Sequence, residues 1–120
     1  MKKGSLLIPF STSFIFAMVP TQNVLPGHGF VFLFTPVTGI QNANSAQNLG
    51  LFSREVDGNS NNHVFGVEFD VFRNEEFGDN NNNHVGIDVN SLTSVFSGIP
   101  GYSRDDGGDS RTLKLITMCK

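Results

Sequence analysis

The stretch Glu68-Phe69-Asp70-Val71-Phe72-Arg73-Asn74 alternates acidic with apolar side chains and then ends in an amide. Successive side chains of a β-strand point to opposite faces, so Glu68 and Asp70 share one face of the predicted strand. Val67, Phe69 and Val71 share the other face, which we expect to be buried. Two neighbouring buried carboxylates repel each other unless a cation or a proton neutralises them. The stretch therefore predicts a strand with a cation site on one face.

An acidic, Asn-rich loop follows this strand and leads to Asp79 and His84. The segment His84–Val89 alternates again, with its polar side chains on one face and its Val and Ile side chains on the other. If the two strands are close in space, Glu68, Asp70 and His84 converge, and the loop delivers Asp79. Oxygen ligands alone suit calcium, whereas a mixed carboxylate and imidazole set suits manganese or another first-row metal.

The composition indicates one all-β domain. A chain of 120 residues has the length of a single domain. It contains 12 Phe and no Trp, it is rich in Gly and Asn, and it shows no sustained apolar period of helical type. With 8 basic against 11 acidic residues it lacks the clustered positive charge that nucleic acids require, so nucleic acid is excluded as a partner.

Short strands joined by polar turns are predicted along the chain, and their number is typical of an antiparallel jelly-roll sandwich. The strands are expected at residues 10–19, 29–34, 49–52, 63–72, 84–89, 90–97 and from 113 to 117. Polar loops separate them, of which residues 73–83 form the loop of the cation site and residues 98–110 a Gly- and Asp-rich loop.

The N-terminal residues imitate a signal peptide without completing one. Lys2 and Lys3 precede a short apolar run, but Ser11-Thr12-Ser13 interrupts it and an alternation typical of a strand follows. We therefore divide the chain into an N-terminal segment, residues 1–9, and a domain, residues 10–120. No run reaches the roughly 20 apolar residues of a membrane span, and the single Cys119 can form no internal disulfide.

The spacing of the cation-site residues resembles the metal-binding core of the legume (L-type) lectins. Glu-x-Asp-x-aromatic-x-Asn is followed by Asp79, His84 and then Val-Gly-Ile-Asp-Val-Asn-Ser. Upstream, Gly27-His28-Gly29-Phe30-Val31-Phe32 and Asn48-Leu49-Gly50-Leu51-Phe52 are similar to two further landmarks of the family. The sequence of these segments is most similar to the lectin ectodomains of plant L-type lectin receptor kinases. The resemblance implies an incomplete concanavalin A-like jelly roll, because the family domain is about twice this length.

The resemblance implies a ligand set for each of two ions, a transition metal (Mn²⁺) and Ca²⁺. The transition metal would be held by Glu68, Asp70, Asp79 and His84. Calcium would be held by Asp70, the Phe72 carbonyl oxygen, the Asn74 side chain and Asp79. In the family these ions perform no catalysis. They hold the loop so that the Asn74 amide bonds a sugar hydroxyl while the Phe72 ring offers an apolar face.

Three departures from the family pattern bear on sugar binding. His28 stands where the family has an Asp that grips sugar hydroxyls, and an imidazole offers at best one acceptor. The family also has a cis peptide bond before that Asp, here Gly27–His28. Ala46-Gln47 lies near the position of a glycine-rich loop, where side chains would crowd a sugar.

The resemblance implies a non-catalytic, glycan-binding protein with an extracellular or cell-surface location, which could form lectin-type oligomers through sheet edges. A degenerate lectin fold that binds protein, peptide or a small apolar ligand is the alternative. A β-glucan hydrolase is a remote one, because its second Glu would be needed where Phe72 and Arg73 stand.

Overall fold

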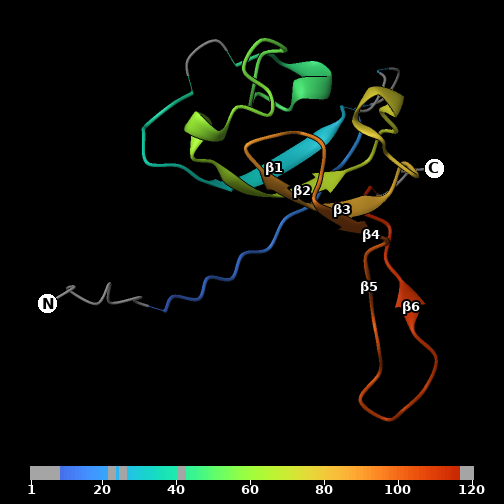
Figure 1. Cartoon of the computed structure of the whole chain (residues 1–120). Helices are drawn as coiled ribbons and strands as arrows, with labels where there is room; N and C mark the ends of the chain where they lie inside the picture. The colour runs from blue at the N-terminus through green and yellow to red at the C-terminus, as the bar shows by residue number, and fades with distance from the viewer. Residues whose placement is uncertain (1–8, 22–23, 25–26, 41–42, 117–120) are drawn as a thin grey trace, which may run out of the picture.

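The computed structural model of the chain describes residues 9–21, 24, 27–40 and 43–116. Its centre is a four-stranded antiparallel sheet in the order β1-β2-β3-β4 (Figure 1). The strands are β1 (Gly29–Phe34), β2 (Phe65–Asp70), β3 (His84–Val89) and β4 (Phe96–Gly98). A small hairpin of β5 (Gly101–Tyr102) and β6 (Arg111–Thr112) extends away from this sheet (Figure 1). Three single-turn 3₁₀ helices lie in the loops, η1 (Ala46–Asn48), η2 (Ser60–Asn62) and η3 (Glu75–Phe77).

The sequence predicted the central strands well and the peripheral ones poorly. The bounds of β1 and β3 are as predicted, and β2 lies inside the predicted 63–72 segment. The predicted strand at 49–52 is wrong, because η1 and a left-handed Leu49 turn the chain there. In place of a strand over 90–97, only Phe96–Gly98 pairs. Of the predicted last strand, Ile116 forms an isolated bridge with Met18, and Thr117 lies outside the described residues.

The strand register places the predicted cation ligands on one face of the sheet. Asp70 pairs with His84 and Glu68 with Gly86 across the β2–β3 ladder. Directly opposed residues of an antiparallel pair project to the same side, so the polar side chains of both strands share a face. Asp88, which alternates with His84 and Gly86 along β3, lies on this polar face as well.

The polar face of the sheet is the buried one, which corrects the expectation that the Val, Ile and Phe face would be. Glu68, Asp70, His84 and Asp88 are at most 4% exposed, whereas Val67, Phe69, Val85 and Ile87 are half-buried. The reason is that the loops cover the polar face. Leu51, Phe52, Val64 and Leu92 form a core cluster there, against which Val31 and Leu33 of β1 pack.

The opposite, apolar face is aromatic and is covered in part by residues 10–18. Phe14 stacks on Phe32 with ring centroids 5.1 Å apart, and Phe16 lies 4.8 Å from Phe69. Ile15, which alternates with them, is fully exposed. The predicted strand at 10–19 is nevertheless wrong, because its described residues form only the Met18–Ile116 bridge. Aromatic contacts therefore hold this segment in place of a ladder of hydrogen bonds.

The described residues contain no helix of the length and apolar character needed to cross a bilayer.

Candidate functional site

Three predicted ligands meet where β2 ends and β3 begins. Glu68, Asp70 and His84 each offer a ligand atom, and these three atoms lie within 4.8 Å of one another. All three side chains are buried, at 3%, 4% and 2% exposed. The two-residue strand period and the β2–β3 register are sufficient to bring them together.

The loop after β2 delivers Asp79 to the same place. Asp79 Oδ1 lies 3.6 Å from His84 Nε2. Its other oxygen, Oδ2, accepts a hydrogen bond of 2.7 Å from the backbone N–H of Asn74, and the Asp79 N–H donates to the Asn74 carbonyl at 3.3 Å. The turn through η3 therefore closes on itself and holds the Asp79 carboxylate toward the strands.

The orientation of His84 leaves one ring nitrogen for a cation. Its Nδ1 lies 3.2 Å from the Asn81 carbonyl oxygen, which can only accept, so Nδ1 carries the proton. In the neutral ring Nε2 then presents a lone pair to Glu68 Oε1 at 3.2 Å and to Asp79. A lone pair that faces two carboxylates needs a proton or a cation between them.

Burial disfavours the ionised form of the carboxylates, and the hydrogen bonds and charges around them offset this cost only in part. It raises the pKa of Glu68, although the Ser94 hydroxyl and His84 oppose the shift. It also raises the pKa of Asp70 to about 6, against a hydrogen bond of 2.5 Å from the Phe72 N–H. Burial and the neighbouring Glu68 raise the pKa of Asp88 to about 7. A bound cation would remove this cost by stabilising the ionised forms.

Ser94 and Asp88 also belong to the cluster, although they were not among the predicted site residues. The Ser94 hydroxyl lies 2.8 Å from Glu68 Oε1 and 2.7 Å from Asp88 Oδ1, and its single proton can serve only one of them. Strand alternation could have found Asp88. Nothing in the sequence marks Ser94, which reaches the site only through the fold of the loop before β4.

The three predicted sugar-contacting residues lie at the same end of the sheet. The His28 and Phe72 rings are in contact, with centroids 4.4 Å apart, and Phe72 is 43% exposed. The His28 carbonyl accepts from the Val71 N–H at 2.9 Å, which fixes the two segments side by side. Asn74 follows Phe72 and is half-buried.

Two backbone features bear on the departures from the family pattern. Every peptide bond between described residues is trans, so the cis bond implied before His28 is not formed. Ala46 has a φ of 60°, a backbone conformation that favours glycine. The glycine-rich loop of the family falls near this position.

The donor set fits a cation pair. It combines buried carboxylates, an imidazole with a free lone pair, and a buried side-chain oxygen that lacks a donor. Asn74 Oδ1 is buried, and in the described part of the chain no donor reaches it. A buried amide oxygen without a hydrogen-bond donor destabilises the fold unless a cation coordinates it. Oxygen is the ligand atom that calcium prefers.

The chain matches a known protein family over most of its length. The model of the family described as Legume lectin domain matches residues 1–110, and the chain belongs to this family. Among curated relatives, it is 62% identical over 111 residues to the L-type lectin-domain containing receptor kinase VII.1 of Arabidopsis thaliana, covering 92% of this chain and 16% of the relative. The probable receptor kinase VII.2 of the same plant is 53% identical over 109 residues, covering 90% and 16%. The resemblance to lectin receptor kinases is thereby confirmed.

Solved legume lectins share the fold. Peanut lectin with a 9mer peptide has a TM-score of 0.60 at 25% identity, over 83% of this chain and 52% of that one. The metal-free form of lectin I-B4 from Griffonia simplicifolia has a TM-score of 0.51 at 25% identity, over 77% and 52%. The all-β, antiparallel, jelly-roll-like class is confirmed. The chain spans 16% of the length of the receptor kinases and about half of the solved lectins.

Proposed function

We propose that this chain is the metal-dependent, non-catalytic carbohydrate-binding part of a lectin of the receptor-kinase type. The observation that carries the proposal is the buried cluster of Glu68, Asp70 and His84, whose ligand atoms lie within 4.8 Å of one another on the face that leads into the Phe72–Asn74 segment. The relatives are receptor kinases, so we propose an extracellular or cell-surface location. The division into residues 1–9 and a partial lectin domain, 10–120, is part of the same proposal.

Six residues would hold the two ions. We assign a transition metal, Mn²⁺ in the family, to Glu68, Asp70, Asp79 and His84. We assign Ca²⁺ to Asp70, Asp79, the Asn74 side chain and the Phe72 carbonyl oxygen. Bound cations would supply positive charge that keeps the carboxylates ionised and the Asn74–Asp79 turn fixed. The chain itself contributes the rigid strand register and the hydrogen bonds that orient Asp79 and His84.

Phe72, Asn74 and His28 would form the sugar site. The half-exposed Phe72 ring offers the flat apolar surface on which the C–H groups of a sugar pack. Asn74 offers an amide for a hydroxyl. His28 replaces the charged acceptor of the family, and hydrogen bonds to charged groups are the stronger ones, so we expect weak affinity for simple sugars.

A second candidate function is the binding of a peptide or protein without sugar recognition. The contact between the His28 and Phe72 rings favours it, because an imidazole beside Phe72 narrows the surface left for a sugar. The solved peanut lectin is described with a 9mer peptide, which shows that one member of the fold was studied with such a ligand.

A glycan array that compares the unmodified chain with His28→Asp tests the sugar proposal. We expect weak binding by the unmodified chain and stronger glucose- or mannose-type binding by the variant, both lost after chelation of metals. His63→Asp is the matched control, because His63 lies at the far end of β2 and should change nothing. If neither protein binds any glycan while calcium and manganese are bound, the sugar proposal fails and the peptide-binding function takes its place.

A further inference from the structure

Asn83, directly before the proposed metal ligand His84, connects the loop of the cation site to a distant part of the chain. Its side-chain nitrogen donates to the Leu113 carbonyl at 2.8 Å, and its side-chain oxygen accepts from the Leu115 N–H at 2.8 Å. Figure 1 shows the chain after β6 coming back from the outlying hairpin to this place, and we call residues 113–116 the returning segment. One amide thus supplies the donor and the acceptor that a neighbouring strand would otherwise supply.

A single turn sets the direction of both the Asn83 side chain and the His84 ring. The Asn83 N–H donates to the Asn81 side-chain oxygen at 2.8 Å, which closes a turn of the Asx type. The Asn81 carbonyl lies 3.2 Å from His84 Nδ1 and accepts its hydrogen bond. His84 is 2% exposed, so a cation at its Nε2 would fix the ring and, through Nδ1, the carbonyl of Asn81. The orientation of a metal ligand is thereby linked to the amide that holds the returning segment.

The returning segment is attached at few other points in the described part of the chain. The Leu113 N–H donates to the Pro100 carbonyl at 2.8 Å, beside the β5–β6 hairpin. Ile116 forms the isolated parallel bridge with Met18, in the stretch that covers the aromatic face. Leu113 itself is 47% exposed. Without the two Asn83 hydrogen bonds, little would hold the segment and its bridge to Met18 in place.

We propose that Asn83 is a positioning residue that couples the cation site to the returning segment. Cation binding holds the His84 ring and the Asn81–Asn83 turn, so that the Asn83 amide keeps both of its hydrogen bonds to the segment. By linkage, docking of the segment strengthens cation binding by the same factor. The segment therefore docks most firmly when the ions are bound, and Ile116 is then held against Met18. This inference rests on the proposed metal site.

Hydrogen exchange read by mass spectrometry, with and without calcium and manganese, tests the coupling. In the unmodified chain we expect the ions to slow exchange of the Leu115 amide by about fivefold or more. Asn83→Ala should remove this effect of the ions at Leu115, and Asn82→Ala, at the exposed neighbouring side chain, should keep it. An equal effect of the ions at Leu115 in all three proteins would overturn the proposal, as would no effect in the unmodified chain.

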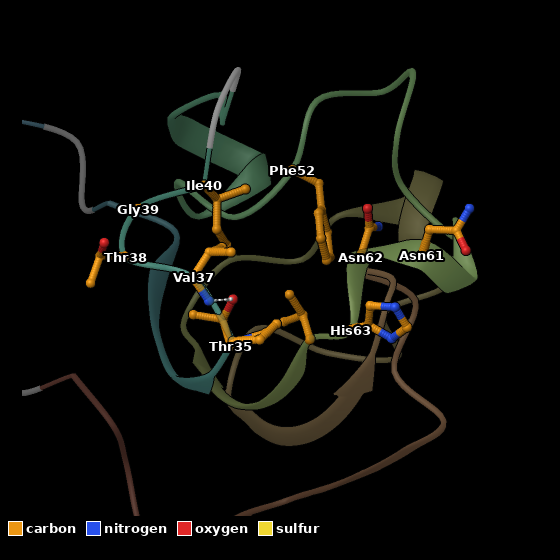
Figure 2. A pocket seen from close by; sticks show the side chains of 11 residues that line it. Thr35, Val37, Thr38, Gly39, Ile40, Phe52, Asn61, Asn62 and His63 are labelled. Carbon is orange, nitrogen blue, oxygen red and sulfur yellow. Dashed lines mark hydrogen bonds between the residues drawn. The ribbon is translucent and has the colours of Figure 1, made fainter.

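Val64 provides the matched reference amide, because its N–H also donates to an Asn side chain, Asn90 Oδ1, at 2.8 Å. It lines a cavity at the other end of β2, whose side chains Figure 2 shows. Exchange at Val64 should respond to the ions alike in the unmodified chain and in Asn83→Ala, within about twofold. A loss of protection at Val64 would show that a variant is unfolded.

Calorimetric titration with the two ions separates this inference from the proposed metal site. By linkage, Asn83→Ala should bind the ions at least about fivefold more weakly, and Asn82→Ala should bind them as the unmodified chain does. Leu115→Pro removes the same hydrogen bond from its other partner and should act like Asn83→Ala, so the test does not depend on one variant folding. Unchanged affinity in both Asn83→Ala and Leu115→Pro would overturn the coupling and leave the metal site standing. Absence of ion binding by the unmodified chain would overturn both.

Discussion

Asp70 and Asp88 are buried carboxyl groups whose protonation links the site to stability. Burial raises the pKa of Asp70 to about 6 and the pKa of Asp88 to about 7, from the ordinary 3.8 of an aspartate. At a pH between 3.8 and the raised pKa of each group, the unfolded chain has lost protons that the folded chain retains. The folded state is therefore favoured at low pH, and this contribution is lost as the pH rises through the folded pKa values.

We accordingly expect the metal-free chain to unfold at lower urea concentration at about pH 7.5 than at about pH 5. Asp88→Asn, which removes the group with the higher pKa, should flatten this dependence. Calcium and manganese should reverse it, because ions bind the deprotonated ligands. Urea titrations of chelator-treated protein at both pH values provide the measurement. A metal-free midpoint that rises with pH would contradict the assignment of uncompensated buried carboxyls.

Gly86 provides a steric test of the same cluster. A Cβ atom at this position would collide with the Ser94 hydroxyl and with Glu68, because the β2–β3 register sets Gly86 directly opposite Glu68. We expect Gly86→Ala to lower the free energy of unfolding by about 1–3 kcal/mol, the usual cost of overpacking.

Gly98→Ala on the neighbouring strand is the control, since a Cβ there meets its nearest atom at 3.9 Å. The two variants can be compared by urea unfolding at one pH. Equal stability of both would show that the Ser94–Glu68 contact is not formed.

At the scale of elements, the sequence was most informative where side-chain period and strand pairing coincide. Alternation over His84–Val89 gave the bounds of β3 and the face of His84 correctly. Ser94 could not be predicted, because its place depends on a loop that crosses the sheet. Alternation was also unable to say which face would be buried. That depends on the loops, which pack Leu51 and Phe52 over the polar side.

Residues 10–18 show the same limit. Alternation puts Phe14 and Phe16 on the side opposite Ile15, and in the structure the two Phe rings pack on the sheet while Ile15 is exposed to solvent. Alternation fixes side-chain direction but supplies no partner for the backbone, and the segment therefore packs without forming a strand.

We expect Phe14→Ala to destabilise the chain by about 1–2 kcal/mol, less than a fully buried Phe because the ring is 45% exposed. Phe14 has ring contacts with Phe16, Phe30, Phe32 and Phe69, all of which the variant loses. Ile15→Ala, at a fully exposed neighbour, should change stability by less than about 0.5 kcal/mol. Thermal unfolding of the three proteins distinguishes the outcomes, and equal effects would mean that the segment does not pack on the sheet.

At the scale of the whole molecule, the apolar face of the sheet remains partly open to solvent. Phe65, Val89 and Phe96 are 42%, 44% and 70% exposed, and the register places all three on this face. Contiguous apolar surface and free strand edges favour association. We expect the chain to self-associate and to show only marginal stability.

Phe96→Lys should lower the mean mass measured by light scattering, because it places a charge on the open face. Tyr102→Lys in the outlying hairpin, at a residue 48% exposed, should not. A monomeric chain with a cooperative thermal transition would contradict this picture of the molecule.

The most direct test of the metal-dependent lectin site is calorimetric titration of the chelator-treated chain with calcium and manganese. Asp70 is assigned to both ions, so Asp70→Ala should abolish both binding events. Asp109→Ala, at an exposed carboxylate in the loop between β5 and β6, should leave them unchanged. We expect saturable binding of both ions by the unmodified chain and by Asp109→Ala, and none by Asp70→Ala. Equal binding by all three proteins, or no binding by the unmodified chain, would contradict the account.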